Sequence, residues 1–305
     1  MDYIMETDGL TKIYGSKAAA DNINIHIRAG EIYGLIGRNG AGKTTIMRML
    51  SGLSSPTKGT FTLFGKTGSQ ARREMKNVGV LIEHPGLYPN LSAYKNLKIK
   101  AIAMGCDTKN GYIENLLELI GLENVGNKPC GSFSLGMRQR LGIGLALVGD
   151  PKLIILDEPI NGLDPQGIVE VRKMLENLRD EKKITVMISS HILEELGKIS
   201  NSYGIIHEGE LLDEFTTDEL SKRCGQFVLI KGPDSKAAID VLAKNGYKNT
   251  ELDNEGFVRV NEKLDESDKM IKALVNGNVA VKEVSVTNTS LEDYYLSVTG
   301  GGHNG

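Results

Sequence analysis

The chain has 305 residues, of which 40% are hydrophobic and 25% are charged, a composition typical of a soluble globular protein with room for one large domain and a smaller one. Its net charge of −3 argues against broad binding to nucleic acid, and its apolar runs are far shorter than the roughly 20 residues of a membrane helix. The N-terminus lacks the pattern of a secretory signal, and the three cysteines lack metal-type spacing. We therefore expect a cytoplasmic protein with reduced thiols and no membrane span.

The first predicted elements are β-strands that lead into a glycine-rich loop. Isoleucines at positions 23, 25 and 27 alternate with polar residues, which is the period of a half-buried strand, and we expect an antiparallel pair of strands around Gly30. The apolar run 32–36 then precedes the segment GRNGAGKTT, and a helical pattern begins at Thr44. A strand, a glycine-rich loop and a helix in this order form the setting in which such a loop binds phosphate.

The glycine-rich loop fits the pattern of a phosphate-binding loop. Its glycines let the backbone curl so that successive N–H groups point at phosphate oxygens. Lys43 is placed to reach the β- and γ-phosphates and Thr44 to give its hydroxyl to Mg²⁺, while the helix directs its positive end at the triphosphate. We therefore predict that the chain binds a nucleoside triphosphate. The residues of this loop expected to contact the nucleotide are Gly37, Arg38, Asn39, Gly40, Ala41, Gly42, Lys43, Thr44 and Thr45.

Beyond the loop, the pattern indicates further strands and then helices. Residues 60–64 and 78–82 favour strands, whereas the pattern from about 92 to 149 is helical. Within that helical span, residues 112–120 carry apolar side chains at helical spacing and stop at Gly121, a residue suited to a helix end. This stretch therefore predicts a helical part that interrupts the strand-rich chain.

Two later apolar runs, 153–156 and 184–188, favour strands and are separated by a helix-like segment, 169–178. Continuous apolar runs of this kind are typical of strands that are buried on both faces. Alternation of strands and helices predicts a parallel sheet with crossover helices, and hence an α/β fold.

Two carboxylates follow the first of these runs. In an open parallel sheet ligands collect beyond the carboxyl ends of the strands, so Asp157 is placed to complete the Mg²⁺ shell with Thr44. Glu158, one residue further on, is placed to orient and deprotonate a water for attack on the γ-phosphorus. His191 ends the next strand, where its imidazole would contact the γ-phosphate and that water, although a lone histidine is more often a packed polar residue or a helix cap. These positions predict hydrolysis of the bound nucleoside triphosphate, with Glu158 and His191 as catalytic residues.

The C-terminal part of the chain predicts a second, smaller domain. We place the boundary near residue 223, because the strand-like run 227–230 opens a new pattern of strand, helix, hairpin, helix, strand and final helix. Residues 224–299 therefore favour a small α+β domain, and the glycine-rich residues 300–305 a flexible tail.

The motifs along residues 1–220, and the order in which they follow one another, resemble those of the ATP-binding subunits of ABC transporters. The resemblance implies a P-loop NTPase fold with antiparallel β and helical subdomains. It implies that Tyr14 stacks on adenine and that the segment FSLGMRQ is the family's signature loop, which by itself would indicate only a helix N-cap. Ser134 and Gly136 match the phosphate contacts of that loop, Asp164 lies in the segment NGLDP that matches the D-loop, and His191 matches the switch histidine.

The resemblance also implies how such a subunit works. Two copies are expected to pair head to tail, each closing ATP between its own phosphate loop and the partner's signature loop, and hydrolysis reopens the pair. Extra contacts made only when ATP is bound give the differential binding that a conformational switch requires. The implied cofactors are ATP and Mg²⁺. The implied partner is a separate membrane permease, on whose cytoplasmic side the subunit sits peripherally, with no nucleic acid involved.

Two positions depart from the family's usual pattern. Leu135 replaces a common glycine in the signature loop, and Glu83 replaces a glutamine that normally bridges Mg²⁺ and the permease. Glutamate keeps an oxygen ligand for the metal but adds a charge and loses the amide donors. Glu83 and the HPG and YP that follow it resemble the same loop in the branch of the family that expels bacitracin and lantibiotic peptides. The segment 290–299 also resembles the C-terminal end of that branch, although by itself its pattern indicates only an amphipathic helix.

The sequence leaves three alternatives open. The chain could drive transport of another cargo, or it could be a soluble ABC ATPase that acts on ribosomes or DNA. The second alternative conflicts with its single motif set and its lack of coiled-coil heptads. In the third alternative the C-terminal domain is the working part of a regulatory binding module.

Overall fold

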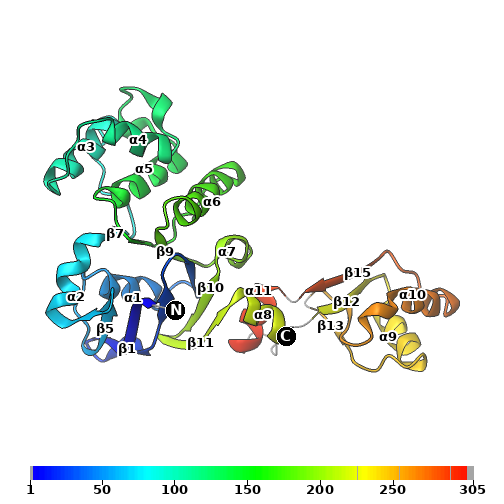
Figure 1. Ribbon diagram of the computed structural model, residues 1–305. Helices are drawn as coiled ribbons and strands as arrows, with labels where there is room; N and C mark the ends of the chain where they lie inside the picture. The colour runs from blue at the N-terminus through cyan, green and yellow to red at the C-terminus, as the bar shows by residue number, and fades with distance from the viewer. Residues whose placement is uncertain (1–2, 225, 254, 289, 301–305) are drawn as a thin grey trace. The chain divides into compact units, whose positions relative to one another are not determined.

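The computed structural model describes residues 3–224, 226–253, 255–288 and 290–300 (Figure 1). The chain divides into two compact units, Met1–Thr217 and Asp218–Gly305. The boundary predicted near residue 223 falls later than this division, within helix α8 (Thr217–Cys224). Apart from Gly300, the predicted flexible tail lies outside the described residues.

The first unit is built on a six-stranded sheet that confirms the predicted α/β fold. The strand order is β11-β10-β4-β9-β8-β7; β7 to β10 and β4 run parallel, and β11 pairs antiparallel with β10. Every residue of β4, β8 and β9 is buried, as expected for strands covered on both faces. The bounds are β4 Ile32–Ile36, β7 Val78–Leu81, β8 Leu153–Leu156, β9 Thr185–Ser190, β10 Ser202–His207 and β11 Glu210–Thr216.

A second sheet is antiparallel, and its strands come from the parts of the chain before and after the phosphate loop. It contains β1 Tyr3–Tyr14, β2 Lys17–Ile23, β3 His26–Arg28, β5 Lys58–Leu63 and β6 Lys66–Thr67. The expected antiparallel pair around Gly30 is wrong, because β3 pairs with β1 while β4 joins the parallel sheet. The strand expected through positions 23, 25 and 27 is also interrupted. Asn22 has a left-handed φ of 49°, and the side-chain oxygen of Asn24 accepts a hydrogen bond from the Gly9 N–H at 2.9 Å.

Some of the helices cover these sheets, and the others form a separate group. The helices of this unit are α1 Lys43–Leu50, α2 Gly68–Glu74, α3 Ala93–Ala103, α4 Tyr112–Leu119, α5 Leu135–Leu147, α6 Pro165–Asp180 and α7 Leu193–Ile199, with short 3₁₀ turns at Met75–Asn77, Glu123–Val125 and Cys130–Ser132. Helices α3, α4 and α5 gather beyond the end of β7, as the helical part predicted between 92 and 149 (Figure 1). One hydrophobic core joins α1 to both sheets.

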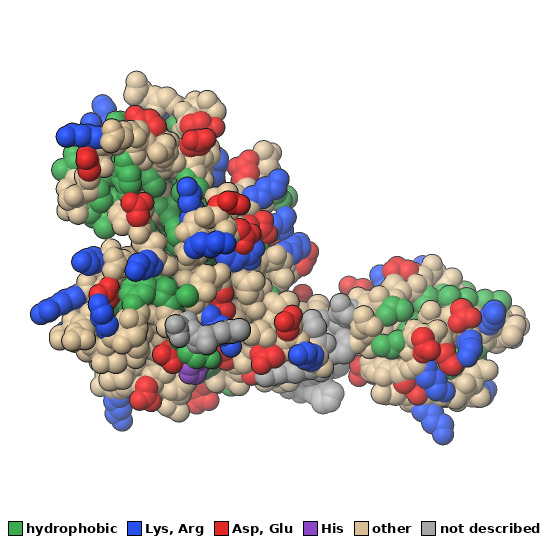
Figure 2. All heavy atoms as spheres, in the orientation of Figure 1, with side chains coloured by type: hydrophobic (Ala, Val, Ile, Leu, Met, Phe, Trp, Pro, Cys, Tyr) green, Lys and Arg blue, Asp and Glu red, His purple; other side chains and the backbone are tan. Residues whose placement is uncertain are grey.

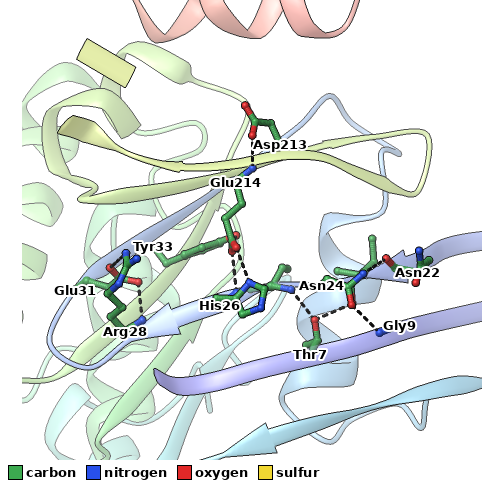
Figure 3. A network of polar contacts seen from close by, with 12 residues as sticks. Thr7, Gly9, Asn22, Asn24, His26, Arg28, Glu31, Tyr33, Asp213 and Glu214 are labelled. Carbon is green, nitrogen blue, oxygen red and sulfur yellow. Dashed lines mark hydrogen bonds and ion pairs between the residues drawn. The ribbon is translucent and has the colours of Figure 1, made fainter. Parts of the chain in front are cut away.

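A partly buried polar network ties the antiparallel sheet to the parallel one (Figure 3). The Glu214 carboxylate on β11 accepts hydrogen bonds from the Tyr33 hydroxyl on β4 and the His26 N–H on β3, both at 2.8 Å, and lies 2.7 Å from His26 Nδ1. Burial raises the pKa of Tyr33 well above its ordinary value, with the nearby Glu214 charge adding to it, so the phenol stays a neutral donor. The network fixes β4, whose far end begins the phosphate loop.

The second unit confirms the predicted small α+β fold. Its elements follow the order βαββαβ, and its four antiparallel strands lie in the order β13-β14-β12-β15, which is the ferredoxin-like arrangement. Its own core, centred on Val228, Leu242 and Met270, lies between the sheet and two helices. The bounds are β12 Gln226–Lys231, α9 Ser235–Lys244, β13 Thr250–Leu252, β14 Val258–Val260, a 3₁₀ turn Leu264–Glu266, α10 Ser267–Asn276, β15 Glu283–Asn288 and α11 Leu291–Val298.

In the part of the chain that the structure describes, no helix combines the length and apolar character needed to cross a membrane.

Candidate nucleotide-binding and catalytic site

The phosphate loop runs from the end of β4 to the start of α1. Gly42 caps α1 with a left-handed φ of 113°, and a Cβ there would lie 2.5 Å from the Ala19 carbonyl oxygen. A Cβ at Gly37 would lie 2.6 Å from the Ile206 carbonyl oxygen. Only glycine therefore fits these two positions without moving neighbouring backbone. The resulting curl leaves the N–H groups at the start of α1 directed into the loop, where they favour an anion.

Lys43 lies inside the loop rather than on its surface. Its side chain is 5% exposed, and its ammonium donates a hydrogen bond of 2.6 Å to the Gly37 carbonyl oxygen. It also lies 3.1 Å from a carboxylate oxygen of Glu158. The loop thus holds one buried positive charge between its own backbone and the strand-end carboxylate.

A hydroxyl and a carboxylate meet beside the loop. The Thr44 hydroxyl donates to Asp157 Oδ2 at 2.7 Å, so the residues predicted to share a metal ion are in contact. The fully buried Ser189 hydroxyl at the end of β9 donates to the other oxygen, Asp157 Oδ1, at 2.6 Å. Hydroxyl and carboxylate oxygens are the ligands that Mg²⁺ prefers, and the bond from Ser189 fixes how the carboxylate is turned. The donor set therefore fits this metal.

The two predicted catalytic residues are brought together. Glu158 Oε2 lies 2.9 Å from His191 Nδ1, while its other oxygen faces Lys43. The Glu158 backbone has a left-handed φ of 49°, and its N–H donates to the Ser189 hydroxyl at 2.9 Å. A non-glycine residue in this conformation is held there by its surroundings, a kind of strain that clusters at functional sites. A carboxylate fixed beside the phosphate loop is placed to take a proton from an attacking water.

The phosphate loop opens onto a cavity of about 820 Å³. All loop residues from Arg38 to Thr45 line it together with Glu158. Its far side is formed by Lys17 and its neighbours on β2 and by the β10–β11 turn at Glu208, neither of which sequence reasoning had singled out. A second cavity of about 780 Å³, between α4 and the end of α6, contains none of the predicted site residues. The size and the charged lining of the first cavity suit a nucleotide.

Gly37 and His191 do not line this cavity, and neither do four other residues that were predicted to contact the nucleotide. Tyr14 ends β1, is half exposed, and lies under the Lys12 ammonium. Ser134 is the N-cap of α5, where its hydroxyl accepts from the Met137 N–H at 3.2 Å, and Gly136 follows in the first turn. Asp164 caps α6 and accepts from the Gly167 N–H at 2.9 Å. The roles of these four residues toward a nucleotide stay predictions. For Ser134 and Gly136, the predicted contact is with the nucleotide held by a second copy of the chain.

Glu83, the third predicted metal ligand, contacts Arg48 rather than Thr44 or Asp157. Its carboxylate is 2.6 Å from the Arg48 guanidinium, and its side chain is 58% exposed. Its backbone has a left-handed φ of 64° just beyond β7. Glu83 therefore reaches the same edge of the sheet as Asp157, but the contact seen here is with α1.

Ser189 is a site residue that sequence reasoning missed. The only signal was a serine at the end of an apolar run, which is common. Because it donates to Asp157 and accepts from the Glu158 N–H, we expect Ser189→Ala to lower kcat for ATP about 10-fold to 100-fold, the usual cost of losing a partner that orients a ligand. Steady-state ATPase assays against Ser190→Ala, a matched change one residue along β9, would check this. Equal rates for wild type and Ser189→Ala would contradict the orienting role.

A phosphate loop, a strand-end carboxylate pair and a histidine just beyond the next parallel strand define a P-loop enzyme that hydrolyses a nucleoside triphosphate. Comparison with known proteins makes this more specific. The family model described as "ABC transporter" matches residues 20–161. The chain is 42% identical over 304 residues to the bacitracin transport ATP-binding protein BcrA of Bacillus licheniformis, covering 99% of each. It therefore belongs to the family of ABC transporter ATP-binding proteins.

Two further comparisons agree. The chain is 45% identical over 211 residues to the lantibiotic transport ATP-binding protein SrtF of Streptococcus pyogenes, covering 69% of this chain and 90% of SrtF. The solved structure of CbiO1 from Clostridium perfringens, part of the ABC transporter complex CbiONQ, matches with a TM-score of 0.65 and 27% identity, over 73% of this chain and 92% of that one. The chain is thus an ATPase subunit of a family whose members work with membrane permeases and dimerise.

Proposed function

We propose that this chain is the motor subunit of an ABC transporter that expels a peptide antibiotic of the bacitracin or lantibiotic type. The observation that carries this proposal is the 42% identity to BcrA over 99% of both chains. That match extends through the second unit, so it is not limited to the ATPase core shared by all such motors. The similarity to SrtF supports the same class of cargo.

We infer that the nucleotide is bound with Mg²⁺, held by Thr44 and Asp157 and, after a change of partner, by Glu83. The ion would neutralise charge on the β- and γ-phosphate oxygens. Lys43 binds those phosphates, Glu158 takes the proton of the attacking water, and His191 keeps the carboxylate oriented. Thr44 and Asp157 support this assignment because their oxygens are already 2.7 Å apart.

The active form is a pair of subunits, in which Ser134 and Gly136 of one copy contact the ATP held by the other. This proposal accounts for Ser134 being exposed at the start of α5 and outside the cavity of its own chain. Tyr14 stacks on adenine, and Asp164 orders the segment between Glu158 and α6 at the same interface. The identity of the second subunit, another copy or a related chain, decides whether the transporter has one kind of motor or two.

The permease docks on the loop after β7 and on α3, at the cytoplasmic face of the membrane. Large hydrophobic side chains are exposed there: Tyr88, Ile99, Ile102 and Met104. Figure 2 shows hydrophobic side chains gathered on the part of the molecule formed by α3 to α5. A gathered apolar surface of this kind is typical of an interaction site.

The decisive experiment measures growth inhibition of the source organism by bacitracin, several lantibiotics and unrelated antibiotics. The gene is deleted and then restored as wild type, as Glu158→Gln, or as Arg73→Met, which changes an exposed residue of α2. We expect deletion to sensitise the cells to one class of peptide only. Wild type and Arg73→Met should restore tolerance, whereas Glu158→Gln should not.

The result that overturns the proposed cargo is an unchanged threshold for every peptide with expression verified by immunoblot. If Glu158→Gln restores tolerance as well as wild type, the chain does not act as a motor. Either outcome leaves the family and the ATPase fold intact.

A further inference from the structure

The ion pair between Arg48 and Glu83 links two parts of the active site. Their closest atoms, Arg48 Nη2 and Glu83 Oε1, are 2.6 Å apart, and the two side chains are 40% and 58% exposed. Arg48 lies on α1 four residues after Thr44, so both side chains share one face of the helix, about 6 Å apart along its axis. The pair therefore joins the Glu83 carboxylate to an arginine whose backbone lies one helical turn after Thr44.

Glu83 lies at the edge of the sheet that carries the other two carboxylates. In the parallel pairing of β7 with β8, Leu81 is opposite Leu156. Glu83 follows Leu81 by two residues, as Glu158 follows Leu156, and the Asp157 N–H donates to the Leu81 carbonyl oxygen at 2.8 Å. Three carboxylates that converge on one edge repel one another unless cations compensate them. Lys43 faces Glu158, and Arg48 is the cation that faces Glu83.

We propose that Arg48 is a positioning residue that competes with the metal ion for the Glu83 carboxylate. This rests on the proposed function, in which Mg²⁺ is held at Thr44 and Asp157. With Arg48 as its partner the Glu83 carboxylate would be withheld from the metal, and without that partner it would be available to complete the ion's oxygen shell. Exposed ion pairs contribute little free energy, so exchange between the two partners has a small cost.

The charge of Glu83 is what makes this competition operate. A carboxylate brings a negative charge to a guanidinium or to a divalent cation, whereas a glutamine amide offers either of them only a neutral oxygen. Arg48 thereby tunes the metal affinity of the site without touching the nucleotide or the metal. Because the side chains of Arg48 and Glu83 are exposed, salt should weaken their ion pair more than it weakens the part-buried contact of Thr44 with Asp157.

The experiment measures binding of Mn²⁺ by electron paramagnetic resonance, with the full chain in excess over ADP. Four proteins form a double-mutant cycle: wild type, Arg48→Met, Glu83→Gln and the double variant. Asp157→Asn tests the metal site itself, and Arg73→Met removes an exposed arginine from α2 as a matched control. Circular dichroism confirms that each variant is folded.

We expect Arg48→Met to tighten Mn²⁺ binding about two- to five-fold, the range for loss of an exposed ion pair that competes with the metal. In the Glu83→Gln background the same change should have no effect, and in the wild-type background its effect should shrink as salt is raised. Arg73→Met should bind Mn²⁺ like wild type.

Two results overturn the proposal while the proposed metal site stands. In one, Asp157→Asn weakens Mn²⁺ binding but Arg48→Met does not tighten it. In the other, Arg48→Met tightens binding equally with Glu83 present or replaced, which would mean that Arg48 acts only through its general positive field. If Asp157→Asn leaves Mn²⁺ binding unchanged, the metal assignment fails and the proposal fails with it.

Discussion

Replacing Glu158 by glutamine is expected to reduce ATP turnover about 10²-fold to 10⁴-fold, the usual contribution of a positioned general base. The amide keeps the shape of the side chain but cannot accept the proton of the attacking water. The amide can turn its oxygen toward the Lys43 ammonium, which lies 3.1 Å from Glu158 Oε1, but without a negative charge it attracts the ammonium less. Turnover would be measured by phosphate release at saturating ATP.

ATP binding should survive this change, and this separates catalysis from binding. In the wild type Lys43 is shared between the Gly37 carbonyl and Glu158, so a triphosphate competes with the carboxylate for the ammonium. Glutamine removes that competitor, and we expect ATP to bind at least as tightly, measured by equilibrium dialysis. Glu194→Gln, which alters a 78% exposed residue of α7, is the matched control and should hydrolyse ATP normally. A Glu158→Gln variant that loses ATP affinity together with turnover would show that Glu158 shapes the loop rather than the reaction.

The phosphate loop is the part of the site that the sequence predicts most fully. Its function depends on backbone conformations that only glycine adopts easily, and on a lysine and a threonine at fixed offsets from them. All of this information is local. The same holds for Asp157 and Glu158, because a strand end in a parallel sheet is a ligand position whichever strands flank it.

Local sequence patterns could not predict contacts between residues on neighbouring elements of the sheet. Ser189 meets Asp157 only because β8 and β9 are neighbours, and Arg48 meets Glu83 only because β7 ends beside α1. Periodicity predicted correctly that Ile25 and Ile27 are buried, yet it could not tell which strand they pair with. Asn24 lies at the break between β2 and β3, both of which pair with β1, and its side chain replaces a backbone acceptor for Gly9.

The removal of Lys43 is the change expected to act most strongly on ATP binding. Lys43→Ala deletes the buried cation that the β- and γ-phosphates would meet, and a charge-assisted contact of this kind contributes about 1.5–3 kcal/mol, or roughly 10-fold to 150-fold in affinity. Dialysis with labelled ATP at several protein concentrations would measure the loss. Turnover at low ATP should fall at least as far.

Two controls isolate the charge from the space that the side chain fills. Lys43→Met keeps an unbranched apolar stem and should lose nearly as much affinity as alanine if the ammonium is what matters. Lys17→Met removes an exposed cation that lines the same cavity and should lower the affinity for ATP only a few-fold, because solvent screens it.

Removing Lys43 also leaves Glu158 without its closest cation, so the Lys43 variants should lose thermal stability. Combining Lys43→Ala with Glu158→Gln should recover that stability but not the affinity for ATP. Wild-type affinity in Lys43→Ala would show that the loop does not bind the triphosphate in the way its geometry indicates.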